Sequence, residues 1–172
     1  MLRRFQAGAP ISTKSSVGVK LRIMQTIQHS VEIYASKENV WKVLWSDQIL
    51  RDWASIIDEG TYMDGDLQEG NEVKFISSVS GYGVVSKVEK MIPNKYVSFI
   101  QVADIKVGKD GSFEKRDKQW TGGKESYEIE EKDEKVILSL KQETPDELVE
   151  YFKIKIPKAL ERVKTLAEMK RI

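Results

Sequence analysis

The feature that most constrains the fold is a change in the spacing of apolar residues along the chain. Between residues 60 and 143, apolar and polar residues alternate in short segments, which is typical of half-buried strands. After residue 144 the apolar residues recur at helical spacing, at Leu148, Phe152, Ile156, Ala159, Leu160, Val163 and Ala167. Several strands followed by one long amphipathic helix bury their apolar faces only by packing the helix on the sheet. The pattern therefore predicts an α+β fold.

The individual elements are bounded by turn and capping residues. Residues 27–34 alternate as a first strand, Ser36 can cap a short helix, and Asp47 can cap a second one that ends near Trp53. Residues 103–120 are highly charged and contain two glycines, so we expect a long mobile loop there. The remaining strands are expected at 60–64, 72–78, 82–91, 95–102, 124–130 and 135–143. They predict a curved antiparallel sheet of about six or seven strands wrapped around the C-terminal helix.

The C-terminal helix has a recognisable start and one irregular position. Residues 144–147, with the sequence Thr-Pro-Asp-Glu, match a capping box in which Thr144 is the N-cap. Pro157 lies inside the helix, where it removes the bond to the Lys153 carbonyl and predicts a kink. Such a kink would lift one half of the helix off the sheet. We therefore expect an internal cavity of roughly 300–1,000 Å³, the usual size of a small-molecule site.

Composition and charge exclude several classes of function. The 172 residues include no cysteine and one histidine, His29, which excludes disulfides, thiolate metal sites and multi-histidine metal sites. Residues 1–22 carry five basic residues and no acidic one, so residues 23–172 hold 23 basic and 27 acidic residues. We expect residues 1–23 to be a disordered basic tail and residues 24–172 to form one domain. The mildly acidic body argues against nucleic-acid binding, which needs a basic patch.

Targeting signals are weak. No apolar run approaches the length of a membrane span, and no apolar region follows the N-terminal arginines as it would in a secretory signal. We therefore expect a cytoplasmic protein without a membrane span. The alternative is an organellar protein, because an Arg-rich, Ser-containing and acid-free tail is also typical of transit peptides.

Three segments resemble a known superfamily. They read VEIYASKENVWKVLWSDQILRDW at residues 31–53, QWTGGKESYEI at residues 119–129 and YFKIKIPKALERVKTLAE at residues 151–168. Together with the order of elements they resemble the SRPBCC superfamily, also called START-like or Bet v 1-like, over about residues 26–169. The most similar branch is the C-terminal domain of the heat-shock-protein-90 ATPase activator homologues. The resemblance implies the helix-grip fold; members include lipid carriers, polyketide cyclases, flavonoid-binding proteins and the chaperone activator.

The candidate site follows from which residues the strands and the helix turn inward. Trp53 and Trp120 are expected at the rim of the cavity, where aromatic rings would stack on a planar ligand. The alternative is that both tryptophans simply pack the helix against the sheet. Glu125 shares a strand face with Tyr127 and is a candidate polar contact, although a salt bridge to a lysine is the alternative. His29 is a possible base or orienting donor, or a core histidine. The interior of the site is predicted to be Phe75, Val84, Tyr127, Phe152 and Ile156.

Three functions remain open. The leading hypothesis is binding of a hydrophobic or aromatic small molecule, the second is a chaperone- or stress-associated partner-binding domain, and the third is a cyclase- or hydrolase-like enzyme using His29 or Glu125. The sequence around Gly81 and Gly83 lacks the third glycine of a dinucleotide site, and no Walker motif, calcium loop or nucleophile elbow is present. We therefore expect no cofactor, no metal and no catalytic constellation.

Overall fold

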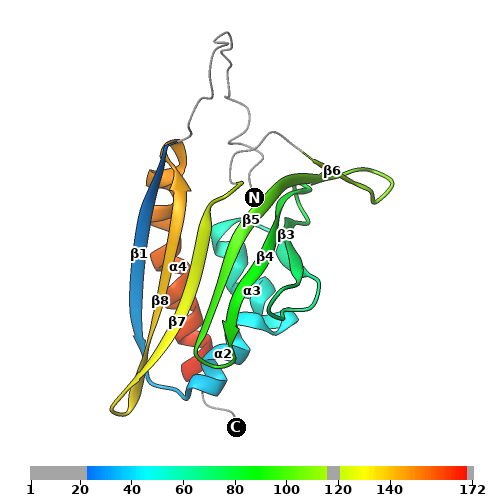
Figure 1. Cartoon of the computed structure of the whole chain (residues 1–172). Coiled ribbons are helices and arrows are strands. Elements are labelled where there is room, and N and C mark those ends of the chain that lie inside the picture. The colour runs from blue at the N-terminus through cyan, green and yellow to red at the C-terminus, as the bar shows by residue number, and fades with distance from the viewer. Residues whose placement is uncertain (1–22, 116–120, 170–172) are drawn as a thin grey trace.

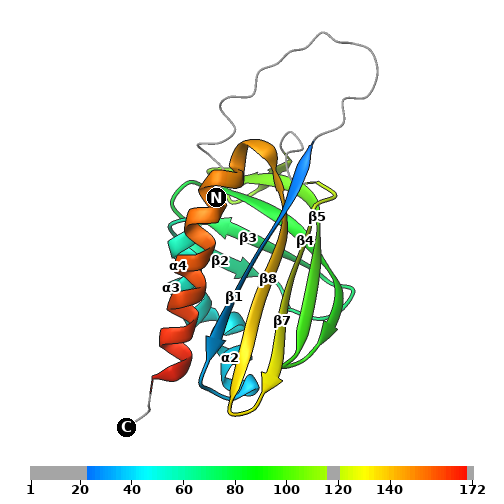
Figure 2. The ribbon, with the colours of Figure 1, turned by 90° about the vertical axis from the view of Figure 1, so that its left-hand side faces the viewer.

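The computed structural model describes residues 23–115 and 121–169. A curved antiparallel sheet packs one face against the long helix α4 (Val149–Glu168) and the two short helices α2 (Lys37–Trp45) and α3 (Asp47–Ile57) (Figures 1 and 2). The buried side chains of all three helices belong to one continuous core with the inner face of the sheet. The predicted α+β helix-grip architecture is confirmed. The expectations for residues 1–22 and for Trp120 concern parts of the chain outside the described residues.

The sheet has eight strands, one or two more than expected. Its spatial order is β1-β8-β7-β5-β4-β3-β2, with β6 paired to β5, and neighbouring strands are antiparallel. The first strand therefore pairs with the last one, which brings residues about 110 positions apart side by side. The strands are β1 (Met24–Ile33), β2 (Thr61–Asp64), β3 (Glu72–Ser77), β4 (Tyr82–Ile92), β5 (Tyr96–Val107), β6 (Phe113–Lys115), β7 (Lys124–Lys132) and β8 (Lys135–Pro145).

The long loop predicted for residues 103–120 is wrong in its first half. β5 continues to Val107, and the short strand β6 pairs with it. The alternation of apolar and polar residues does not predict this continuation of β5, because the register between β4 and β5 shifts between Val85 and Ser86. Such a bulge changes which face of a strand a residue joins. Asp104 consequently lies opposite Val84 and is fully buried, so its charge did not indicate a loop.

Of the three N-cap residues predicted from the sequence, one is confirmed. Ser36 caps α2 as predicted, accepting a 3.1 Å hydrogen bond from the Asn39 amide. Asp47 is the first residue of α3 rather than its cap, and its carboxylate accepts bonds from Arg51 one turn later. The capping box at Thr144 is wrong. β8 runs on to Pro145, a 3₁₀ turn (Asp146–Leu148) follows, and α4 begins at Val149.

Pro157 does not separate the two halves of α4 from the sheet. Residues before it, such as Phe152 and Ile156, and residues after it, such as Leu160 and Val163, are all buried in the same core. The apolar stripe predicted from the sequence is therefore correct along its whole length. The idea that a kink lifts one half of the helix off the sheet is wrong, since packing holds both halves down.

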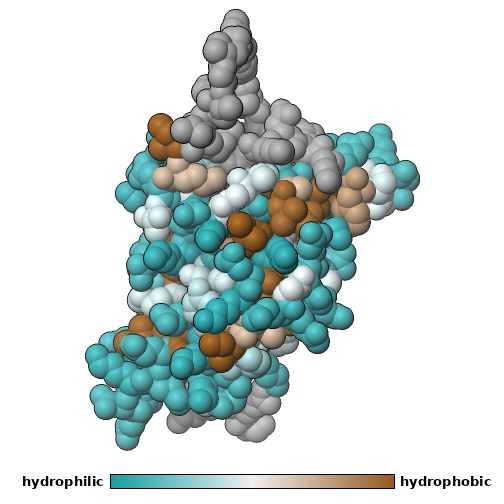
Figure 3. Space-filling model, in the orientation of Figure 1, coloured by the Kyte–Doolittle hydropathy of each residue, from teal (hydrophilic) through white to brown (hydrophobic). Residues whose placement is uncertain are grey.

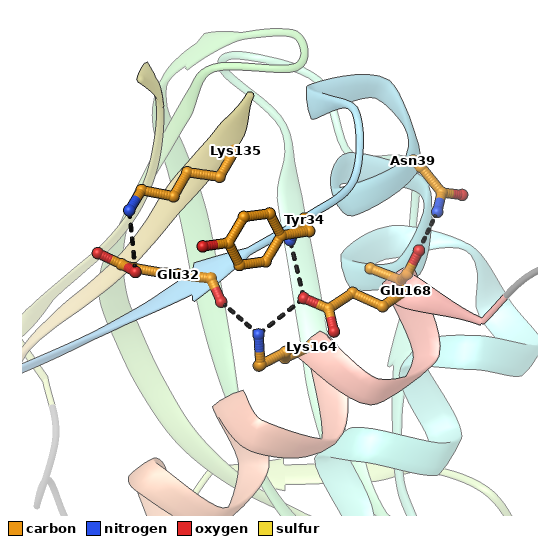
Figure 4. A network of polar contacts seen from close by, with 7 residues as sticks. Glu32, Tyr34, Asn39, Lys135, Lys164 and Glu168 are labelled. Carbon is orange, nitrogen blue, oxygen red and sulfur yellow. Dashed lines mark hydrogen bonds and ion pairs between the residues drawn. The ribbon is translucent and has the colours of Figure 1, made fainter. Parts of the chain in front are cut away.

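The C-terminal end of α4 is attached by a polar network (Figure 4). Lys164 donates to the Glu32 carbonyl at 2.8 Å and pairs with Glu168 at 2.7 Å. Glu168 also accepts from the Tyr34 amide, and Asn39 donates to the Ala167 carbonyl at 2.6 Å. The hydrogen bond from Lys164, followed by that from the Tyr34 amide, lowers the pKa of Glu168. This end of the helix is thus tied to β1 and α2.

The outer face of the sheet is largely hydrophilic, with apolar groups over β4 and β5 (Figure 3). Val102 on β5 and Phe113 on β6 are exposed apolar side chains. In the part of the chain that the structure describes, no helix is both long enough and apolar enough to cross a membrane.

Candidate functional site

An internal cavity of about 70 Å³ lies between the inner face of the sheet and the helices. One wall comes from the end of α2, from α3 and from the start of β2. The opposite wall comes from the central strands of the sheet, and Phe152 of α4 covers one side. The lining residues are Trp45, Leu50, Trp53, Ala54, Ile57, Thr61, Phe75, Val84, Gln101, Glu125, Tyr127, Gln142 and Phe152.

The cavity is smaller than the sequence-based expectation of roughly 300–1,000 Å³. At about 70 Å³ it has room for a few water molecules or a small chemical group. The reason is that aromatic side chains fill most of the space that a single helix leaves over the sheet. A larger ligand would require some of these rings to change rotamer.

Most of the predicted site residues do meet at this cavity. Ile156 is buried in the core but is not part of the lining. His29 is partly buried on β1 opposite Leu140, two strands away from Glu125, and it does not line the cavity either. The predicted residues that line it are Trp53, Phe75, Val84, Glu125, Tyr127 and Phe152.

Trp53 is part of the wall rather than of the rim. Its side chain is 3% exposed, and its indole N–H donates to the Val43 and Leu44 carbonyls at 3.1 and 3.3 Å. Trp45, which sequence reasoning did not assign to the site, is the centre of the aromatic cluster. Its ring lies edge-on to those of Tyr127 and Trp53, with centroids 4.9 and 6.5 Å apart. These edge-to-face contacts pack the apolar part of the cavity wall.

Glu125 places a carboxyl group in this apolar surrounding. Its Oε2 accepts a long hydrogen bond of 3.4 Å from the Tyr127 hydroxyl. Desolvation raises the pKa of Glu125 from its ordinary value of 4.5 to about 7, and the Tyr127 bond opposes this rise. Burial, followed by the negative charge of Glu125, raises the pKa of Tyr127 as well. Glu125 therefore changes charge near neutral pH. Within the described residues no ion pair joins Glu125 to a lysine, and the neighbouring Lys124 instead lies 3.9 Å from Glu89.

Two glutamines complete a polar wall that sequence reasoning missed. Gln142 is the cross-strand partner of Glu125, and Gln101 follows Phe99, which is the partner of Glu125 on the other side. A signal for both was present in the sequence. Each glutamine continues an alternating series of inward apolar residues, which are Val97 and Phe99 before Gln101 and Val136, Leu138 and Leu140 before Gln142.

The raised pKa of Glu125 predicts how stability changes with pH. In the unfolded chain the carboxyl group ionises near 4.5, whereas the folded protein keeps it protonated up to about 7. The stabilising difference is complete below pH 4.5 and is lost as the pH rises through 7. We expect this group to lower the free energy of unfolding by roughly 2 kcal/mol between pH 5 and pH 8.

Urea denaturation of wild type and of Glu125→Gln at both pH values measures this effect. The Glu125→Gln variant should lack the 2 kcal/mol contribution. Glu128→Gln is the matched control, because Glu128 lies on the same strand but is exposed. Equal pH dependence in all three proteins would contradict the raised pKa.

Within residues 23–115 and 121–169, no group of three or more histidine and carboxylate side chains is arranged to hold a metal ion. The polar groups in the cavity lining are one carboxyl group, one phenol, one threonine hydroxyl and two amides, beside aromatic and aliphatic side chains.

Comparison with known proteins identifies the fold of the chain. A scan against protein-family models finds no match, and a search of curated proteins also finds none. Solved structures that match include the Aha1 dimer from Colwellia psychrerythraea, with a TM-score of 0.62 and 24% identity over 85% of this chain and 98% of that chain. Protein MLL2253 from Mesorhizobium loti matches with a TM-score of 0.64 and 16% identity over 86% of this chain and 100% of that chain.

DynU16, described as a putative protein in the dynemicin biosynthetic locus, has a TM-score of 0.62 and 13% identity. The alignment covers 84% of this chain and 47% of DynU16. These likenesses and the sheet wrapped around α4 agree with the resemblance seen in the sequence. The chain has the helix-grip fold, also called the START-like or Bet v 1-like fold.

Proposed function

We propose that the protein binds a small hydrophobic or aromatic molecule in the cavity between the sheet and α4. The observation that carries the proposal is the lining, in which nine of the thirteen residues are apolar or aromatic and lie beside a few polar groups. This combination of apolar walls with few polar groups is characteristic of small-molecule sites. The fold supports the same reading, because it encloses space between one helix and a concave sheet.

The ligand is expected to be small, or to enter by moving side chains. The C-terminal end of α4 is tied to β1 and α2, whereas Phe152 at the other end borders the cavity. Rotation of Trp45 would enlarge the space without breaking a hydrogen bond of its indole nitrogen, which has no partner within the described residues. Single-ring and two-ring compounds are therefore the first candidates to test.

A cavity-filling substitution tests the proposal. Ala54 lies on α3 and lines the cavity, so Ala54→Leu places three more carbon atoms near it. We expect saturable quenching of tryptophan fluorescence by small aromatic compounds or flavonoids in wild type, and at least tenfold weaker binding in Ala54→Leu. Ala35→Leu is the control, since Ala35 is a partly buried alanine that does not line the cavity. Absence of saturable binding by every compound would contradict the proposal and favour the chaperone- or stress-associated partner domain.

A cyclase- or hydrolase-like enzyme is a second candidate because of Glu125. A carboxyl group whose pKa lies near 7 inside an apolar cavity has the properties of a general acid or base. Mass spectrometry of each bound compound after incubation tests this function. Conversion that is lost in Glu125→Gln and retained in Glu128→Gln would identify Glu125 as a catalytic residue, whereas binding without conversion leaves a binding protein.

A further inference from the structure

The cavity has one polar wall, made by Glu125, Gln101 and Gln142 on the neighbouring strands β7, β5 and β8. Glu125 and Gln142 are directly opposite each other across the β7–β8 pair. Gln101 is held close to this pair by the backbone, because its main-chain N–H donates to the Gly123 carbonyl at 2.8 Å. Three polar side chains from different strands thus lie at one end of an otherwise aromatic space.

Both amides are buried, and each retains hydrogen-bonding capacity. Gln101 is 8% exposed, and its Oε1 accepts from the Ser86 hydroxyl at 2.8 Å. Its side-chain nitrogen Nε2 has no partner within the described residues. Gln142 is 7% exposed, and its Nε2 donates to the Thr144 hydroxyl at 3.0 Å, which leaves its carbonyl oxygen without a partner in the same residues. Neither atom is among the fully enclosed side-chain atoms that lack a partner, so this donor and this acceptor beside the cavity are accessible to a polar ligand atom.

Resting on the proposed function, we infer that this polar wall selects ligands whose polar end is a hydroxyl group on an apolar or aromatic body, and that it rejects carboxylates. The hydroxyl would donate to the Gln142 carbonyl oxygen or to Glu125 and accept from the Gln101 amide. The aromatic rings of Trp45 and Tyr127 would contact the body of the ligand. In this arrangement Glu125 is the residue that determines which polar end a ligand can have.

Charge is the reason for rejecting carboxylates. A ligand anion beside an ionised Glu125 would place two like charges in an apolar cavity, which is strongly unfavourable. The anion can bind only when Glu125 carries a proton to share. A hydroxyl group has no such restriction, because it can donate to the ionised carboxylate and accept from the protonated one.

Among the described residues, no other charged side chain lines the cavity. Tyr127 is the one further titratable residue of the lining, and every lining residue from α2, α3, β2, β3, β4 and α4 is uncharged. His29 on β1 lies outside the lining. Of the charged neighbours of Glu125, Lys124 is exposed and Glu143 is partly buried, and the Lys124 main-chain N–H donates to the Glu143 carboxylate. The pH dependence of anion binding should therefore follow Glu125.

Three single-ring probes of similar size distinguish the possibilities: toluene, benzyl alcohol and benzoate. Binding to the full-length protein is measured between pH 6 and pH 9 from the indole N–H resonances of Trp45 and Trp53, assigned with Trp→Phe variants. Benzyl alcohol should bind about tenfold more tightly than toluene, with less than a threefold change over this pH range. Benzoate should lose about tenfold in affinity for each pH unit above 7, because each unit removes the required proton from Glu125.

Two variants and one control variant locate the effect. Glu125→Gln should make benzoate binding independent of pH, and Glu128→Gln should behave as wild type because Glu128 is exposed on the same strand. Gln142→Leu should reduce benzyl alcohol binding towards that of toluene and leave toluene unchanged. The wild-type pH series needs no substitution, so it tests the inference even where a variant folds poorly.

The outcomes separate the two proposals. Binding of toluene, benzyl alcohol and benzoate with equal affinity at every pH would overturn the selectivity and leave the proposed binding function intact. Benzoate binding more tightly than benzyl alcohol at pH 8 would also overturn it. If no probe binds, the small-molecule function fails and the selectivity fails with it.

Discussion

Replacing Phe152 by alanine is expected to lower the free energy of unfolding by about 3–5 kcal/mol. Phe152 is 2% exposed and packs edge-on against Tyr151, with ring centroids 5.1 Å apart. Because its ring already borders the internal cavity, the space left by the substitution would join an existing void. The cost of such a substitution rises with the volume that the surroundings cannot fill.

Urea denaturation followed by circular dichroism measures this loss. Ile154→Ala is the matched control, since Ile154 is two residues away on the same helix and 56% exposed. It should change the free energy of unfolding by about 0.5 kcal/mol or less. A loss below about 1 kcal/mol for Phe152→Ala would mean that the cavity end of α4 collapses or contributes little to the core.

Gly83→Ala is expected to cost about 3 kcal/mol or more, because no space exists for a side chain at this point of β4. A Cβ atom at Gly83 would lie 2.3 Å from the Phe75 carbonyl oxygen and 2.9 Å from the Ile76 Cα. Both neighbours are backbone atoms of the paired strand β3, so relief requires the two strands to separate. Phe75 and Val84 line the cavity beside this contact, and the substitution should therefore also disturb the site.

Gly70→Ala separates this steric effect from the ordinary cost of losing a glycine. Gly70 has a φ of 93°, and a Cβ there meets nothing within 4 Å. Its substitution should cost about 1–2 kcal/mol through backbone strain alone. Thermal and urea unfolding of the two variants compare the effects, and equal losses would contradict the close approach of β3 and β4 at Gly83.

The aromatic and carboxyl parts of the site were predictable because they follow from one rule. Residues at alternate positions of a strand share a face, and so Glu125 with Tyr127 and Phe75 could be placed inside from the sequence. The same rule applied to Gln101 and Gln142, which continue inward apolar series. They were overlooked because a glutamine near the end of a strand is usually exposed. A polar residue in phase with a buried series is the signal that would have found them.

Other differences arose where tertiary contacts overrode local preference. The sequence at residues 144–147 matches a capping box, but pairing of β8 with β1 extends the strand to Pro145 and delays the helix to Val149. Thr144 uses its hydroxyl to accept from Gln142 instead. Backbone pairing over ten residue pairs of β1 and β8 outweighs one cap, which contributes only about 1 kcal/mol.

The sequence by itself determined the class of fold, the two short helices, the inward stripe of α4 and six of the thirteen residues of the cavity lining. All of these depend on periodicity and on turn residues, which are local properties. The tertiary structure decided the pairing of β1 with β8, the bulge that buries Asp104, the meeting of Glu125 with Gln101 and Gln142, and the small volume of the cavity. These depend on which distant segments pack together and how closely their rings interlock, and one sequence does not specify such distances.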